Sequence, residues 1–168
     1  MSKRLLFCVE TTPRANTDYA YIKETVEHYY ALDRRIVLRP IYMKSKTRYN
    51  SKAVQEDIRR QSGSENTSVI YCIDTDDYDT STDAKEILDQ ITKYCRQNGY
   101  DFVFFCKDVE DVYLGNRIPD TQKAAAIRYF RTSHAIEQMK TKRLETAHYQ
   151  HHSSNILNVL DRYLTRKK

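Results

Sequence analysis

The chain has 168 residues and a formal net charge of +5, and no apolar run approaches the roughly 20 residues that a membrane-spanning helix needs. Its start, MSKRLLFCVE, becomes acidic too early for a signal peptide. A chain of this length buries roughly two-thirds of its unfolded surface in one core. These features argue against a membrane or secreted protein and predict a single cytoplasmic domain over residues 1–168.

Acidic and basic residues are segregated along the chain. Residues 1–73 hold 13 basic and 8 acidic side chains, residues 74–111 hold 4 and 11, and residues 112–168 hold 11 and 4. An acidic centre between basic ends suits a cation site within a surface that attracts polyanions. Ordinary solvated helix faces are the alternative interpretation.

Short apolar runs with aromatic and β-branched residues predict four buried strands, at residues 4–9, 35–43, 68–73 and 100–106. Pro40 places the second of them at a sheet edge or near a strand end, because proline cannot donate to a β-ladder.

Helical spacing of apolar residues predicts the intervening elements. One helix is expected over residues 17–31 with Thr17 as N-cap, a short one begins near residue 53, and a third follows Ser81 or Thr82 and stops at Gly99. Strands that alternate with helices predict right-handed crossovers, and therefore an α/β fold with a mostly parallel sheet of about four strands flanked by helices.

Beyond Gly115 the pattern becomes helical throughout. Helices are predicted over residues 121–149, with a break near Thr132–Ser133, and over residues 153–164. Residues 1–115 are thus expected to form an α/β core, and residues 116–168 a helical C-terminal extension.

Cysteine and histidine residues give little sign of a metal or redox site. The four cysteines, at positions 8, 72, 95 and 106, form no CxxC pair, and three lie in apolar runs, which predicts buried free thiols. His151 and His152, with His148 nearby, are expected at a solvated helix end, because adjacent histidines on a helix point in different directions.

Three predicted strands end alike, with a carboxylate two residues after a cysteine: Glu10, Asp74 and Asp108. The carboxyl ends of parallel strands share one edge, where ligands bind in open α/β sheets. Alternating aspartates such as Asp74 and Asp76 can both approach one hard cation. Glu10, Asp74 and Asp76 are therefore expected to converge on one cation site, with Asp77 as a further candidate; turn or cap chemistry is the alternative.

Asp79 is also a candidate in this acidic run, whereas Asp108 is expected to be a surface or cap residue. No Walker A loop, GxGxxG motif or Ser/His/Asp arrangement is present in the sequence.

In the order of its motifs the chain resembles Toprim-fold proteins, and among them the RloB-like family. Phe7–Thr11 is similar to the family's first strand ending Cys-Glu-Gly, with Thr11 at the place of the glycine, and Asp18-Tyr19 precedes a helix as in the family. Asp74-Thr75-Asp76 matches a later Asp-x-Asp, and Val109–Leu114, with Glu110, matches a glutamate at the start of a helix after the fourth strand. The likeness covers roughly residues 3–115.

This resemblance implies a Toprim-like (Rossmannoid) fold and Mg²⁺-dependent phosphoryl transfer on nucleic acid, by a nuclease of a defence or mobile-element system. It implies that Mg²⁺, or Mn²⁺, is held by Asp74, Asp76 and Glu10, with Glu10 alternatively a general acid or base. Glu110 is a further catalytic candidate, for which helix capping is an equal explanation.

Two groups of basic residues are expected to contact a nucleic-acid backbone, DNA or RNA, unless they are merely solubilising faces. Tyr42 and Tyr49 are interleaved with the first group and offer stacking platforms. The first group is Lys44, Lys46, Arg48, Lys52, Arg59 and Arg60, and the second is Lys123, Arg128, Arg131, Lys140, Lys142 and Arg143.

Two other functions remain open from the sequence. A catalytically degenerate module would keep the fold and bind nucleic acid or a protein partner without needing a metal. A receiver-like phospho-acceptor domain would use an aspartate at the end of a central strand and a lysine after a later one, for which Lys107 is available, although the first strand supplies only Glu10.

Overall fold

The computed structural model describes residues 2–63 and 66–168. Its centre is an all-parallel sheet with the strand order β2-β1-β3-β4. The predicted α/β class with about four parallel strands is confirmed, and Pro40 lies in an edge strand as expected. The strands are β1 (Lys3–Val9), β2 (Ile36–Tyr42), β3 (Thr67–Asp74) and β4 (Asp101–Phe105).

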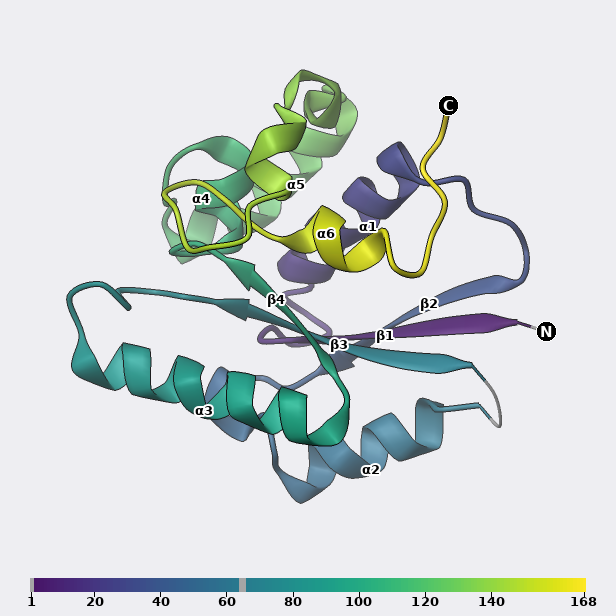
Figure 1. Ribbon diagram of the computed structural model, residues 1–168. Helices are drawn as coiled ribbons and strands as arrows, with labels where there is room; N and C mark the ends of the chain where they lie inside the picture. Colours follow the sequence, from purple (N-terminus) through teal and green to yellow (C-terminus); the bar gives the residue numbers. More distant parts are fainter. Residues whose placement is uncertain (1, 64–65) are drawn as a thin grey trace.

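Helices cover both faces of this sheet (Figure 1). On one face lie α1 (Thr17–Tyr29), α4 (Val109–Leu114), α5 (Asp120–Thr132) and α6 (Ile156–Leu160), and on the other lie α2 (Lys52–Gln61) and α3 (Thr82–Asn98). None of the described helices is long and apolar enough to cross a membrane.

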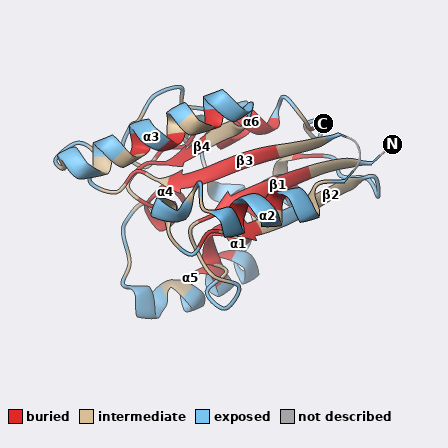
Figure 2. Cartoon of the chain, turned by 90° about the horizontal axis from the view of Figure 1, so that it is seen from below, coloured by how far each residue is buried: buried red, intermediate tan, exposed pale blue. Residues whose placement is uncertain are grey.

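Side chains along the central strands point alternately to the two faces of the sheet, and together they form two apolar layers. In β1, Phe7 packs with the α1 side of the sheet, whereas Leu6 and Cys8 pack with α2 and α3. Because both faces are covered, β1 and β3 are buried through most of their length (Figure 2). All four cysteines are free and buried, which confirms the expectation from their apolar surroundings.

The ends of α3 confirm their sequence signals. The Ser81 hydroxyl accepts a hydrogen bond from the Ala84 backbone N–H at 3.2 Å, and Gly99 follows the helix with a left-handed φ of +68°. The predicted cap of α1 is wrong: Thr17 is its first helical residue, and Asn16 is the N-cap, whose side chain makes no capping hydrogen bond.

The C-terminal extension differs most from its prediction. Helix α5 ends at Thr132, as expected, and His134, just beyond its end, adopts a left-handed φ of +53°. Residues 133–149 contain only two short 3-10 turns, at 135–138 and 141–144. Ile136 and Leu144 are nevertheless buried, so their apolar spacing marks separate points of attachment to the core. The helix predicted over residues 153–164 is reduced to Ile156–Leu160.

This extension also completes the outer edge of β4. The Asn155 side chain accepts a hydrogen bond from the Phe104 N–H at 3.0 Å and donates one to the Phe102 carbonyl at 2.9 Å. The Cys106 N–H donates to the Ser153 carbonyl at 2.9 Å. Residues 153–155 thereby satisfy backbone groups that an edge strand would otherwise leave open.

Replacing Asn155 with alanine is expected to lower the free energy of unfolding by about 1–3 kcal/mol, because two backbone groups of β4 lose their partner. Urea denaturation of wild type and Asn155→Ala measures the change. Asn158→Ala, which removes an exposed amide bonded to the Glu145 carbonyl, is the control. Equal losses in both variants would contradict a special role for Asn155 at this edge.

Candidate active site at the carboxyl edge of the sheet

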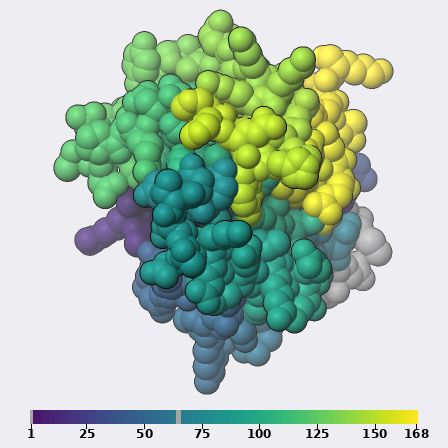
Figure 3. Space-filling model, turned by 60° about the vertical axis from the view of Figure 1, so that its left-hand side comes forward, coloured from purple at the N-terminus to yellow at the C-terminus, as the bar shows by residue number. Residues whose placement is uncertain are grey.

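Glu10 and Asp74 meet where the two central strands end. Glu10 directly follows β1 and Asp74 ends β3, and the two strands are paired in parallel. The Glu10 carboxylate accepts a hydrogen bond from the Asp74 N–H, with Oε2 and N 2.6 Å apart. The predicted adjacency of these two residues at one edge is therefore confirmed. In Figure 3, which brings this side of the molecule forward, the teal segment after β3 lies between the green upper and blue lower layers.

A backbone turn carries Asp76 away from the strand. The Thr75 N–H donates to the Phe105 carbonyl at 3.0 Å, and the Asp76 N–H donates to the Lys107 carbonyl at 2.8 Å. Asp76 has a left-handed φ of +49°, and its side chain is 44% exposed. Asp76 therefore lies at the outer, solvent-facing side of this edge.

Lys46 extends its ammonium group into the same acidic edge. Its Nζ lies 2.6 Å from the Asp74 carbonyl oxygen, 2.5 Å from Asp76 Oδ2 and 3.7 Å from Glu10 Oε1. Burial works to lower the pKa of Lys46, but the charges of Glu10 and Asp76 outweigh it and raise that pKa above its ordinary value. A lysine that was expected on a nucleic-acid surface thus neutralises the acidic edge itself.

Two further carboxylates lie on the α1 side of the sheet. Asp18, in the first turn of α1, and Glu110, in the first turn of α4, are both buried. Neither carboxylate oxygen of Glu110 has a hydrogen-bond partner among the described residues, and its nearest cation is Lys123 Nζ, 3.7 Å from Oε2. Burial and the neighbouring charges of Glu10 and Glu110 raise the pKa of Asp18 to about 8.

The carboxylates at this edge shift one another's pKa values through electrostatic repulsion. Burial, opposed by Lys46, raises the pKa of Glu10 to about 7. Burial, together with the charges of Glu10, Asp18 and Glu110, raises the pKa of Asp74 well above its ordinary value. Such shifts are typical of sites at which negative charge is held without full compensation.

The other predicted acidic candidates are held in ion pairs or caps. Lys107 forms an ion pair with Asp79 and lies 3.8 Å from Asp77. The Asp108 side chain caps α4 by accepting from the Asp111 N–H at 2.8 Å, which confirms the cap prediction, although Asp108 is buried and not a surface residue. Arg117 lies between Asp108, at 3.2 Å, and Asp77, at 3.4 Å.

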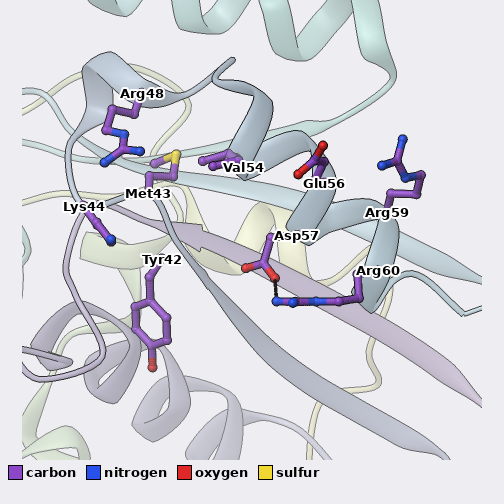
Figure 4. Close-up of a pocket in the computed structure, with 10 residues that line it drawn as sticks. Tyr42, Met43, Lys44, Arg48, Val54, Glu56, Asp57, Arg59 and Arg60 are labelled. Atoms are coloured by element: carbon purple, nitrogen blue, oxygen red, sulfur yellow. Dashed lines mark hydrogen bonds and ion pairs between the residues drawn. The ribbon is translucent and has the colours of Figure 1, made fainter.

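Four of the predicted nucleic-acid contacts gather around one cavity of about 460 Å³ (Figure 4). Tyr42 lines it from β2 and Val54 from α2. Asp57 also lines it and is paired with Arg60. The basic residues of this lining are Lys44, Arg48, Arg59 and Arg60.

Among the remaining basic candidates, Lys140 and Arg143 line a second cavity of about 470 Å³, and the others are dispersed. Lys52 begins α2 and is exposed, outside the cavity lining. On α5, Lys123 approaches Glu110 and Asp120, and Arg131 pairs with Glu24 at 2.9 Å. Arg128 is exposed on the same helix. The structure thus groups the first basic set more tightly than the second.

The histidine prediction is wrong about the local structure, since residues 148–152 form turns and no helix end. His152 has a left-handed φ of +60°, and its Nδ1 lies 3.1 Å from Asp111 Oδ2. Over residues 2–63 and 66–168, no three His, Cys, Asp or Glu side chains are close enough together to hold one metal ion. Glu10, Asp74 and Asp76 therefore share an edge without converging on a single point.

Asp18 and Lys46 are the site residues whose roles the sequence did not reveal. Asp18 lies in the first turn of α1, the helix that follows β1 and packs on the sheet. The start of such a helix lies near the carboxyl edge of a parallel sheet. That signal was present in the sequence. No sequence pattern predicted the position of Lys46, because a lysine in a basic loop is usually solvated. No protein-family model, curated protein or solved structure matches the chain.

The raised pKa values predict how stability depends on pH. A carboxyl whose pKa is higher in the folded state contributes stability that is fully present below its unfolded pKa and lost as pH rises through its folded pKa. From their ordinary values of 4.5 and 3.8, Glu10 and Asp18 rise to about 7 and about 8. The metal-free protein is therefore expected to lose thermal stability between pH 5 and 8.

Asp18→Asn should make stability less dependent on pH, because asparagine does not titrate and so removes the carboxyl whose pKa burial raises in the native state. At pH 8 the variant should melt at a higher temperature than wild type, by about 2–4 °C for each kcal/mol gained in the free energy of unfolding. Thermal melts from pH 5 to 8 measure the slope, with Asp89→Asn, on the exposed face of α3, as control. A slope that is the same in wild type and both variants would refute the assignment.

Proposed function

We propose that this chain is a Toprim-type, Mg²⁺- or Mn²⁺-dependent phosphoryl-transfer protein that cleaves nucleic acid, similar to RloB-like nucleases of defence or mobile-element systems. The observation that carries the proposal is the buried, incompletely compensated negative charge at the carboxyl edge, above all the Glu110 carboxylate without a hydrogen-bond donor among the described residues. Four free, buried thiols support a reducing cytoplasmic location.

The residue types at this edge are those that a hard divalent cation prefers, but no three of these carboxylates lie close enough together in the described chain to hold one, so metal binding would require them to move. Asp74, Asp18 and Glu110 offer carboxylate oxygens in surroundings that already disfavour their charge. Glu10 and Asp76, the other predicted ligands, face the ammonium of Lys46. Bound at this edge, Mg²⁺ would supply positive charge to phosphate oxygens during phosphoryl transfer.

The chain's own residues would perform the remaining tasks. Glu10, with a pKa of about 7, can take up or release a proton near neutral pH, which suits a general acid or base. Lys46 would place a fixed positive charge beside it. The cavity lined by Lys44 and Arg48 would bind backbone phosphates, with the ring of Tyr42 available for a base.

Asp74→Asn tests the metal-dependent reaction, because it preserves shape and removes a negative charge that a hard cation requires. Cleavage of labelled DNA and RNA, with Mn²⁺ titrated, should fall by at least about 100-fold, the usual scale on which removing one electrostatic contribution slows catalysis. Binding of the same substrates should persist or strengthen, since repulsion of phosphate decreases. Unchanged cleavage would exclude Asp74 as an essential ligand.

Lys44→Gln/Arg48→Gln tests the basic cavity. Affinity for single-stranded DNA or RNA should fall at low salt, and the slope of log affinity against log salt should decrease by about 0.7 for each phosphate that the protein no longer neutralises. Lys93→Gln, which removes a positive charge from the exposed face of α3, is the matched control. If the control has the same effect as the double variant, net charge and not this cavity governs binding.

The alternative function, a catalytically degenerate binding module, is favoured by one observation: Lys46 forms a close ion pair with Asp76, at 2.5 Å, without any metal. Metal-independent binding with no cleavage by the wild type would select it. The receiver-like alternative requires Lys107 beside the acceptor Asp74, but the Lys107 ammonium contacts Asp77 and Asp79 instead.

A further inference from the structure

The second cavity, of about 470 Å³, is lined by the end of α4, the end of α5 and residues 135–143. Tyr113 and Leu114 line it from α4, whose first turn carries Glu110, so the cavity and that buried carboxylate lie at opposite ends of one short helix. Sites for small molecules are typically clefts of about 300–1,000 Å³, mostly apolar with a few polar groups. This cavity has the size of such a site.

Aromatic side chains form much of the lining. Tyr113 and Phe130 are buried and pack edge to face, with ring centroids 5.8 Å apart, and the Tyr113 hydroxyl is hydrogen-bonded to Thr25 at 2.5 Å. Tyr129 lines the same cavity but is 73% exposed, the most exposed large hydrophobic side chain of the described chain. An exposed ring beside an apolar cavity is a surface on which a planar ligand can stack.

The charged residues of this lining are cations. Lys140 and Arg143 line the cavity, and no aspartate or glutamate of the described chain does. Neither cation forms an ion pair with a described acid. The cavity around Arg48, by contrast, has Glu56 and Asp57 in its lining. The second cavity therefore attracts an anion that no lining carboxylate repels.

The irregular segment after α5 holds the two cations in position. Ile136 and Leu144, on either side of them in the sequence, are buried in the core. The Arg143 N–H donates to the Lys140 carbonyl at 2.9 Å, and the Arg143 carbonyl accepts from the Ser154 N–H at 2.8 Å. Because Ser154 also bridges to β4, this wall of the cavity is attached to the sheet.

We propose that this cavity binds one nucleotide, with the base stacked on Tyr129 and the phosphate held by Lys140 and Arg143. A planar apolar ring joined to a compact anion matches the aromatic and the cationic parts of the lining. Gln138, in the same lining, has an amide that both donates and accepts hydrogen bonds, as the edge of a base does.

The neighbouring cations do not extend this cavity into a track for a nucleic-acid strand. Arg128 and Lys142 are outside its lining, and Arg131 pairs with Glu24 at 2.9 Å. A strand is bound along a groove of cations that follows its backbone, whereas two adjacent cations suit a single phosphate group. The ligand is therefore a free mononucleotide, at a site separate from the edge proposed for cleavage.

Titration calorimetry of the full chain with the four common ribonucleoside monophosphates tests the site directly. Wild type should bind at least one of them. The corresponding nucleoside, which lacks the phosphate, should bind at least about tenfold more weakly, because hydrogen bonds to a charged group are lost. Ribose phosphate, which lacks the base, should bind at least about fivefold more weakly. Absence of binding of all four at millimolar concentration would overturn the proposal.

Variants locate the bound nucleotide. Tyr129→Ala should weaken binding by at least about fivefold, the lower end of the loss for one stacked base, whereas Tyr129→Phe keeps the ring and should bind like wild type. Arg143→Gln should weaken it by at least about tenfold. Lys140→Gln, at an exposed position, replaces Arg143→Gln if the latter does not fold. Lys44→Gln/Arg48→Gln alters only the first cavity and is the matched control.

The remaining outcomes decide between occupants and sites. Unchanged affinity in Tyr129→Ala or in the cation variant, or a loss in the matched control, would place the nucleotide elsewhere and overturn the assignment. Tighter binding of a single-stranded oligonucleotide than of any mononucleotide, lost in Tyr129→Ala, would make a strand the occupant and overturn the free-nucleotide site. Asp74→Asn should bind the nucleotide like wild type, so a failure of this site and a failure of the proposed cleavage are distinguishable.

Discussion

The Glu10 carboxylate joins two neighbouring strands through the Asp74 N–H and faces the ammonium of Lys46, and the charge arrangement of the whole carboxyl edge depends on this three-way contact. A parallel sheet covered on both faces leaves its strand ends as the natural place for polar groups. Acids gathered there are partly desolvated, so each additional charge costs free energy unless a cation offsets it. The arrangement of lysines around the edge follows from that constraint.

The compensating cations come from elements that are distant in sequence. Lys46 belongs to the turn before α2, Lys123 to α5, and Arg117 to the connection between α4 and α5. Lys46 and the Asp74 carbonyl that it contacts are 28 residues apart in the sequence, so no local pattern predicts the contact. At Asp76 a cation lies within a short contact of the carboxylate and balances its charge. At Glu110 no described residue donates a hydrogen bond to the buried carboxylate.

Local patterns predicted the sheet and the ends of α3, because tertiary contacts reinforce those patterns. The C-terminal extension was predicted only in part: α5 ends at the expected break, but Ile136 and Leu144 are spaced like a helix face and are buried from separate short turns, which spacing cannot distinguish from a helix. At the site, the rule that parallel strands end together correctly made Glu10 and Asp74 neighbours. Whether acids converge on one centre depends on backbone turns such as the left-handed φ of Asp76; aspartate adopts this conformation more readily than most residues, but the DTDD run does not specify which of its aspartates does so.

Charge balance also determines whether an acidic edge and the polyanionic substrate of the proposed function would be compatible in one small protein. A carboxylate edge alone would repel phosphate, and the repulsion would be strongest where the edge is least solvated. Lys46 lowers the net negative charge at the edge, and Lys44 and Arg48, from the same short segment, line the basic cavity. Residues 44–48 therefore connect the two surfaces. A phosphate backbone drawn to the cavity would meet the edge at its most neutral part, which is where a fixed ammonium contributes most to its approach.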